Sequence, residues 1–173
     1  MYISSIELNN YRNFRSHIIE FNKGINVIIG SNNSGKSNLL RAMALIFNPS
    51  EKKNLSIDDF NKTISLEELK LQPPKINISV TFSQDDKENL MGDDLVIVSQ
   101  WLTKLEEPYE AKLHYEFCLP LKHHEDYKRM LSSAKSEVEA WEIIDRNFLR
   151  LYTYKIYGGN LENQIIADGE YLK

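Results

Sequence analysis

The stretch Gly30-Ser31-Asn32-Asn33-Ser34-Gly35-Lys36-Ser37 fits the phosphate-binding pattern G-x-x-x-x-G-K-[ST] at every specified position. Glycines in this pattern let the backbone turn tightly with its N–H groups pointing inward, so a polyphosphate can sit on a ring of donors at a helix N-terminus. Lys36 is then placed to reach the β- and γ-phosphates, and the Ser37 hydroxyl to hold Mg²⁺. The stretch therefore predicts a nucleotide site with Lys36 as its candidate catalytic residue.

The residues on either side of this loop favour the same interpretation. Before it, residues 25–29 form a short, mostly β-branched run of the kind that makes a buried strand. After it, apolar residues recur at helical spacing until Asn48-Pro49 ends the element; they are Leu39, Leu40, Met43, Ile46 and Phe47. Strand, glycine-rich loop and helix in this order favour a nucleotide site over the alternative, a Gly/Ser turn with an incidental lysine.

The chain has 173 residues, the size of one ordinary domain, and a formal net charge of −4. The charge is unevenly spread, because residues 1–53 carry seven Lys and Arg against three Glu and are therefore basic. This basic end surrounds the phosphate loop, as expected for a polyanion site, while the overall acidity argues against tight DNA binding by this chain alone.

Cysteine content and hydropathy predict the compartment. The single cysteine, Cys118, permits no disulfide framework and favours a structural thiol in a reducing cytosol. No apolar run approaches the length of a membrane span, and residues 1–4 lack the basic start of a signal peptide. We therefore expect a cytoplasmic protein with no membrane partner.

Two β elements are expected before the phosphate loop. The first covers residues 2–8, a polar and aromatic corner follows at residues 9–15, and the second strand covers residues 17–21. Asn22-Lys23-Gly24 then turns the chain into the expected buried strand. Nucleotide-binding folds whose loop follows the very first strand have no such pair. The sequence therefore predicts an α/β P-loop fold of the ATP-binding-cassette (ABC) type, with a mixed sheet, helices and an extra antiparallel edge.

The opening as a whole carries a family resemblance. Residues 10–14 (Asn-Tyr-Arg-Asn-Phe) between two strands, followed by residues 24–30 (Gly-Ile-Asn-Val-Ile-Ile-Gly) and the phosphate loop, resemble the N-terminal lobe shared by two groups of proteins. One group is the chromosome-maintenance and recombination ATPases, and the other is the overcoming-lysogenisation-defect (OLD) family of ATP-dependent nucleases.

The resemblance implies ATP and Mg²⁺ as cofactors and places Arg12 beside the triphosphate. For Arg12, a solvated turn residue is an equally weighted alternative. The expected nucleotide-binding residues are Arg12, Asn13, Gly30, Asn32, Asn33, Ser34, Gly35, Lys36, Ser37 and Asn38.

Residues 56–60 and Gln84 each have two interpretations, one functional and one purely structural. Residues 56–60 (Ser-Ile-Asp-Asp-Phe) resemble the short acidic and aromatic segment that follows the first helix in OLD-type proteins, although turn chemistry accounts for the same residues. Residues 76–82 alternate strictly and predict a half-buried strand. Gln84 follows this strand, where a cassette ATPase could place a glutamine that senses Mg²⁺ or water; a solvated strand end is the alternative.

The second half of the chain predicts alternating helices and strands. We expect a helical face formed by Leu95, Val98, Trp101, Leu102 and Leu105. A strand at 111–117, one long helix over 127–148, a strand at 149–157 and a hairpin turn at 158–160 into residues 164–166 follow.

The acidic and histidine pairs of this half are expected to be structural. Asp85-Asp86 and Asp93-Asp94 are placed to cap helices rather than to form a catalytic carboxylate pair. Residues 123–126 (His-His-Glu-Asp) are expected to be a solvated helix start rather than metal ligands, because adjacent residues do not share a helix face.

The sequence lacks two segments that hydrolysis needs in this class. It contains neither an apolar strand ending in Asp-Glu, which would hold Mg²⁺ and polarise water, nor the Ser-Gly-Gly type of signature loop that completes a partner's site across a dimer. We therefore expect residues 1–173 to be the N-terminal lobe of an ABC-type ATPase domain, with inserted helices and strands over residues 85–173. The C-terminal half of the ATPase and any nuclease domain would lie elsewhere. The alternative is a degenerate nucleotide sensor.

Of the families with this opening, the OLD pattern fits best. A transporter cassette would already have shown the signature loop, and a chromosome-maintenance ATPase would have entered a coiled coil. The resemblance implies an ATPase coupled to an endonuclease in antiviral defence or DNA processing, with DNA bound by other parts of the full protein. It also implies a homodimer or higher homo-oligomer and a possible partner protein. The alternatives are a repair ATPase of the chromosome-maintenance or recombination type and a non-catalytic scaffold regulated by ATP.

Overall fold

The structure is a computed structural model, and it describes residues 1–32, 34–84, 98–104, 106–159 and 165–166. Its strands are β1 (Tyr2–Tyr11), β2 (Phe14–Glu20), β3 (Ile76–Ser83), β4 (Leu102–Lys104), β5 (Glu110–Cys118), β6 (Thr153–Gly158) and β7 (Ile165–Ile166). Its helices are α1 (Lys36–Phe47), α2 (Leu66–Leu71), α4 (His124–Leu131) and α5 (Glu137–Ile143). Short 3-10 turns lie at Ile57–Asp59, Ser99–Trp101, Leu121–His123 and Leu149–Leu151, and a π-helical turn lies at Ile144–Phe148.

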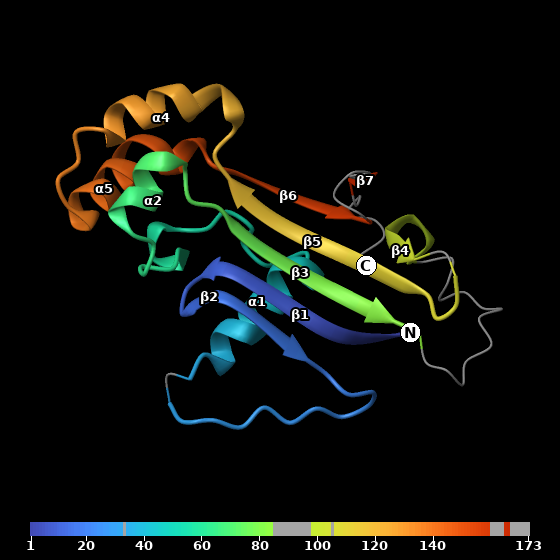
Figure 1. Ribbon diagram of the computed structural model, residues 1–173. Helices are drawn as coiled ribbons and strands as arrows, with labels where there is room; N and C mark the ends of the chain where they lie inside the picture. Colours follow the sequence, from blue (N-terminus) through green and yellow to red (C-terminus); the bar gives the residue numbers. More distant parts are fainter. Residues whose placement is uncertain (33, 85–97, 105, 160–164, 167–173) are drawn as a thin grey trace.

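The strands form one sheet in the order β2-β1-β3-β5-β6-β7, with β4 paired to β5 (Figure 1). Every ladder among these strands is antiparallel. The two strands expected before the phosphate loop are present as the β1–β2 hairpin, and the expected hairpin after residue 158 is present as β6 and β7. The α/β fold class is therefore confirmed.

One face of the sheet carries the core. Ile6 of β1 pairs with Val80 of β3, which pairs with Leu113 of β5, and all three side chains are fully buried. One position along, polar residues line up on the opposite face, where Ser79 of β3 pairs with both Glu7 and His114. The alternation that predicted half-buried strands thus sets the register, since a slip by one residue would expose the apolar row.

Helix α1 packs on the buried face of the sheet through Leu39, Ala42, Leu45 and Ile46. Its C-terminal Phe47 lies edge-on to Phe82 of β3, with ring centroids 6.0 Å apart. The helix ends at Asn48, as the Asn48-Pro49 signal predicted. The phosphate loop at the N-terminus of α1 is therefore anchored by an amphipathic helix docked on the core.

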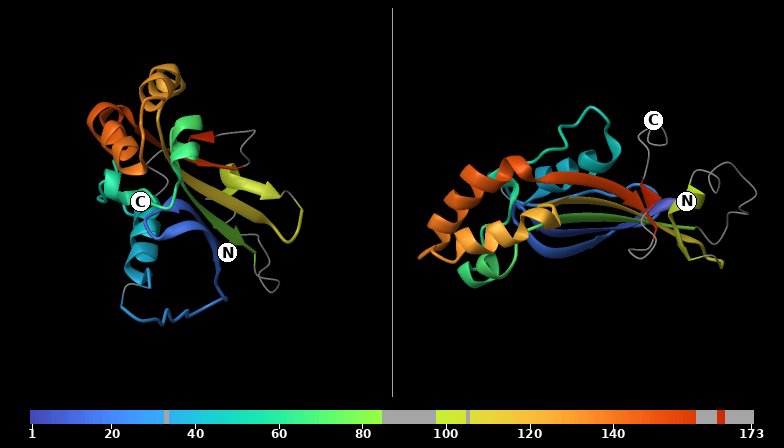
Figure 2. Two further views of the ribbon diagram at one scale, coloured as in Figure 1. Left: turned by 60° about the vertical axis from the view of Figure 1, so that its left-hand side comes forward. Right: turned by 90° about the horizontal axis from the view of Figure 1, so that it is seen from above.

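Helices α2, α4 and α5 gather at one end of the sheet (Figures 1 and 2). Phe60 lies at the centre of this end and contacts the rings of Phe117, Trp141 and Tyr152. Two buried tyrosine hydroxyls hold this end together. Tyr127 of α4 donates to the Leu69 carbonyl oxygen of α2 at 2.8 Å, and Tyr152, just before β6, donates to that of Pro74, just before β3, at 3.0 Å.

The expected buried strand before the phosphate loop is not formed. Residues 25–29 have no regular structure and run outside the sheet, and Ile25 and Ile29 are 95% and 89% exposed. A strand is stable only when neighbouring strands satisfy its N–H and C=O groups, and none of the described strands pairs with this segment. Residues 25–29 have the apolar sequence of a strand, but no neighbouring strand among the described residues pairs with them.

Two helix predictions are also wrong. The single helix expected over residues 127–148 is two helices, α4 and α5, because Ser132 and Ser133 turn back to bond the carbonyl oxygens of Arg129 and Met130 and Ser136 caps a new helix. The helical face ending at Leu105 fails because the chain extends into β4 at Leu102. Leu95, Leu105 and the aspartate pairs at residues 85–86 and 93–94 lie outside the described residues.

Candidate functional site

The phosphate loop meets α1 at Gly35, the N-cap residue, whose φ of +95° is left-handed. A Cβ atom here would overlap the Asn13 side-chain amide and approach Phe14 Cζ at 2.9 Å. At the start of the loop, a Cβ atom on Gly30 would lie 2.6 Å from Ser34 Oγ. Glycine is therefore favoured at Gly35 by both its left-handed φ and close approach, while at Gly30 a side chain would displace the Ser34 hydroxyl.

Lys36 is the first residue of α1, and its side chain folds back over the loop. Its Nζ donates to the carbonyl oxygens of Gly30 at 2.6 Å and Ser31 at 2.7 Å, and lies 3.3 Å from Ser34 Oγ. These contacts hold a cation over a hollow of about 280 Å³. The hollow is lined by Asn32, Ser34, Gly35, Lys36, Ser37 and Asn38. The structure thus brings together most of the predicted phosphate ligands; Asn33 lies outside the described residues.

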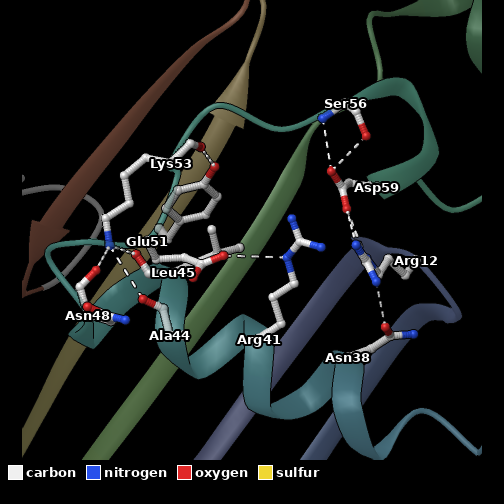
Figure 3. A network of polar contacts seen from close by, with 11 residues as sticks. Arg12, Asn38, Arg41, Ala44, Leu45, Asn48, Glu51, Lys53, Ser56 and Asp59 are labelled. Atoms are coloured by element: carbon white, nitrogen blue, oxygen red, sulfur yellow. Dashed lines mark hydrogen bonds and ion pairs between the residues drawn. The ribbon is translucent and has the colours of Figure 1, made fainter.

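Arg12 reaches the same turn of α1 from the β1–β2 corner (Figure 3). Its NH1 group donates to Asn38 Oδ1 at 2.8 Å, and the Asn38 amide in turn donates to Asn13 Oδ1 at 2.7 Å. The predicted residues Arg12 and Asn13 therefore lie beside the N-terminus of the phosphate-loop helix. The alternative for Arg12 was a solvated turn residue, whereas its guanidinium forms hydrogen bonds within the protein.

Asp59 also belongs to this site, although the sequence indicated it only as part of the acidic and aromatic segment at residues 56–60. Its carboxylate is buried and accepts hydrogen bonds from the Ser56 amide and hydroxyl, both at 2.9 Å, and from Arg12 Nε at 2.8 Å. Burial alone would raise the pKa of Asp59, but the hydrogen bonds from Ser56 and Arg12 and the Arg12 charge lower it below its ordinary value. The pattern Ser56-x-x-Asp59 is a capping-box signal that could have identified it.

The C-terminal end of α1 is closed by a lysine. Lys53 Nζ lies 2.6 Å from the carbonyl oxygen of Leu45, 2.8 Å from that of Asn48 and 3.4 Å from that of Ala44. A cation at the carbonyl groups of the last helical turn complements the helix dipole, so Lys53 stabilises α1 at the end opposite the phosphate loop (Figure 3).

Gln84, the predicted second Mg²⁺ contact, is not brought to Ser37. Its side-chain Oε1 accepts a hydrogen bond from the backbone N–H of Tyr109 at 2.9 Å, and the backbone N–H of Gln84 donates to the Tyr109 carbonyl oxygen at 3.0 Å. Gln84 follows Ser83, which pairs with Tyr2 at the start of β1, whereas the nucleotide site adjoins the opposite end of that strand. In this structure Gln84 closes the turn to Tyr109.

The remaining metal and thiol candidates carry no site. Within the described ranges, no cluster of three or more His, Cys, Asp or Glu residues could hold a metal ion. His124 Nε2 lies 2.9 Å from the Leu119 carbonyl oxygen, at the start of α4. Cys118 is a free thiol. Burial, together with the neighbouring Glu116, raises the pKa of this thiol to about 11, which makes the reactive thiolate rare.

None of the helices in the described part of the chain is both long and apolar enough to span a bilayer.

Comparison with known proteins identifies relatives of this fold and loop. The family described as AAA ATPase domain matches residues 1–166. The DNA replication and repair protein RecF of Pediococcus pentosaceus is 46% identical over 43 residues, which are 25% of this chain and 12% of RecF. The chromosome partition protein Smc of Thermoplasma acidophilum is 32% identical over 98 residues, which are 56% of this chain and 8% of Smc. The chain thus matches only a small part of the length of these relatives.

A solved structure from a study of ATP-driven dimerization and DNA stimulated activation of SMC ATPases is also similar. It matches 99% of this chain and 76% of that chain, with a TM-score of 0.46 and 18% sequence identity.

Proposed function

The chain belongs to the AAA ATPase domain family, and from this premise we propose that residues 30–37 bind the triphosphate of ATP, with Ser37 holding its Mg²⁺. The observation that carries the proposal is the position of Lys36, whose ammonium group is held within 2.7 Å of two loop carbonyl oxygens at the N-terminus of α1. An ammonium group there, together with the helix dipole, is suited to a polyphosphate.

The residues present fit such a ligand. Gly30 and Gly35 lack a Cβ atom, so Ser34 can pack against the first and Asn13 and Phe14 against the second, which keeps the loop compact. Lys36 supplies a positive charge beside the loop, and Arg12 supplies a planar guanidinium on the neighbouring corner. In ATP hydrolysis, a bound Mg²⁺ would neutralise charge that develops on the phosphate oxygens.

We further propose that the chain acts as the N-terminal lobe of an ABC-type ATPase domain and that residues 25–29 pair with strands supplied from outside the described residues. The support is the exposure of four apolar side chains immediately before the phosphate loop, at Ile25, Val27, Ile28 and Ile29. Such a patch on a soluble protein marks a contact surface. The Asp-Glu strand and signature loop that hydrolysis needs would come from the same source.

The biological setting that we propose is DNA metabolism. Its support is that the curated relatives are named as a DNA replication and repair protein and a chromosome partition protein. In this setting the full protein would be a homodimer or higher homo-oligomer that binds DNA through other parts. An OLD-like nuclease acting in phage defence is a narrower form of the same proposal, supported by the opening motif alone. A scaffold that binds ATP without hydrolysing it is the second candidate, favoured by the missing Asp-Glu strand in the sequence.

Calorimetric titration with Mg-ATP tests the proposal. We expect saturable binding of one nucleotide per chain, displaced by pyrophosphate because the phosphates carry most of the contacts. Binding that adenosine displaces and pyrophosphate does not would contradict a phosphate site. Hydrolysis measured on the full-length protein, which would supply the Asp-Glu strand and the signature loop, separates the ATPase from the non-catalytic scaffold.

A further inference from the structure

The guanidinium of Arg12 is held by Asp59 and Asn38. Its Nε and NH2 groups both lie 2.8 Å from Asp59 Oδ1, and NH1 lies 2.8 Å from Asn38 Oδ1. A guanidinium has five N–H donors, and among the described residues these three contacts engage three of them. The Arg12 side chain is 28% exposed, so part of it is open to solvent.

Asp59 is itself held rigidly. Its side chain is 4% exposed, and its second oxygen, Oδ2, accepts both hydrogen bonds from Ser56. That division leaves Oδ1 to accept from Arg12 alone among the described residues. Because the Asp59 carboxylate is fixed, it sets the position of the Arg12 guanidinium. A flexible carboxylate on the surface would instead adjust to the position of the arginine.

The same segment also holds the backbone of Arg12. Arg12 has a φ of +48°, which non-glycine residues seldom adopt. Its amide donates to the Asp59 carbonyl oxygen at 2.8 Å, and its own carbonyl oxygen accepts from the Asn61 side chain at 2.7 Å. Backbone and side chain of Arg12 are thus both set by residues 56–61.

The Arg12 side chain extends from the β1–β2 corner toward α1 and bonds Asn38 there. Asn38 is the third residue of α1 and lines the hollow together with Lys36 and Ser37. The hydrogen bond from Arg12 NH1 to Asn38 Oδ1 places the guanidinium beside this turn of the phosphate-loop helix. We infer that Asp59 is a positioning residue, which aims the guanidinium of Arg12 at the anion bound by the phosphate loop. This inference rests on the proposed ATP site.

The test is a double-mutant cycle on Mg-ATP affinity, measured by calorimetry for Asp59→Asn, Arg12→Ala and the double variant. Loss of a charge-assisted contact should weaken binding about 10-fold or more in Arg12→Ala. Asp59→Asn should weaken it by about the same factor, and the double variant should bind no worse than Arg12→Ala, since Asp59 acts only through Arg12. Asp58→Asn, the same change at the exposed neighbour, is the control and should bind as the wild type does.

A purely structural role would lower the unfolding temperature without this non-additivity. If Asp59→Asn does not fold, Ser56→Ala replaces it, because it removes one hydrogen bond to the carboxylate and leaves the charge; a weakening of about 2-fold to 5-fold is then expected. Wild-type affinity in Asp59→Asn or Ser56→Ala, or additive losses, would overturn the inference. Loss of binding in Lys36→Ala with no effect of Arg12→Ala would overturn it and leave the ATP site standing. No binding by the wild type would overturn both.

Discussion

Arg12 and Asp59, which lie 47 residues apart in the chain, meet through both backbone and side chain. The Arg12 amide donates to the Asp59 carbonyl oxygen at 2.8 Å, and Arg12 Nε donates to Asp59 Oδ1 at the same distance. This double contact joins the β1–β2 corner to the segment that follows α1. Arg12 also bonds Asn38 of α1, so the corner links this segment to the phosphate-loop helix.

The contact predicts a specific acid sensitivity. The pKa of Asp59 is lowered in the folded state, so its contribution to the free energy of unfolding is present above the unfolded-state pKa of about 3.9 and is lost as the pH falls through the folded-state value. Asp59→Asn should therefore flatten the loss of stability below about pH 4, measured by urea unfolding at a series of pH values. The exposed Asp58→Asn serves as the control, and a difference curve for Asp59→Asn that does not change with pH would contradict the prediction.

Replacement of Gly35 should destabilise the fold more than its conformation alone requires. Gly35→Ala imposes left-handed strain and also pushes the new methyl group against Asn13 and Phe14, at an expected total cost of about 3 kcal/mol. Gly24 is the matched control, because its φ is +91° and nothing lies within 4 Å of its added Cβ atom, so Gly24→Ala should cost only about 1 kcal/mol. Equal losses in denaturant unfolding would show that the close approach at Gly35 is absent.

Lys53 should stabilise the end of α1. Lys53→Ala leaves the carbonyl oxygens of Leu45 and Asn48 without their charged donor, and we expect the free energy of unfolding to fall by about 1–2 kcal/mol. The neighbouring Lys52 is exposed, and Lys52→Ala should change stability by less than about 0.5 kcal/mol. The same small effect for both variants would argue against a capping role.

The apolar segment before the phosphate loop should contribute nothing to the stability of this chain. Ile25 is 95% exposed and Ile78 fully buried, so Ile25→Ala should leave the free energy of unfolding within about 0.5 kcal/mol, while Ile78→Ala should lower it by about 2–5 kcal/mol. Amide hydrogen exchange provides a second measurement, with rapid exchange expected at residues 25–29. A large loss in Ile25→Ala would mean that the segment is buried after all.

Features encoded in short stretches could be predicted from the sequence. The glycine positions, the helix that begins at Lys36 and ends before Asn48, and the alternating strand at residues 76–82 follow from local sterics and from a periodicity that one face of the sheet buries. The first hairpin was predicted for the same reason. These features need few distant partners to be recognised.

Features that depend on distant partners could not be predicted. A β-branched run becomes a strand only when other strands flank it, and among the described residues none flanks residues 25–29, so the expected strand is not formed. Helical spacing continued across Ser132–Ser136, although local serine hydrogen bonds end one helix and begin another there. The role of Asp59 depends on Arg12, 47 residues away, and spacing along the chain does not reveal that contact.

The most direct test of the nucleotide site is Mg-ATP affinity in Lys36→Ala compared with the wild type. Removal of the ammonium group held over the loop should weaken binding at least about 100-fold, while Lys52→Ala, which removes an exposed charge from the same basic end, should leave affinity unchanged. Unfolding curves of both variants should stay close to that of the wild type. Undiminished Mg-ATP binding by a folded Lys36→Ala variant would contradict the assignment of residues 30–37 as the phosphate site.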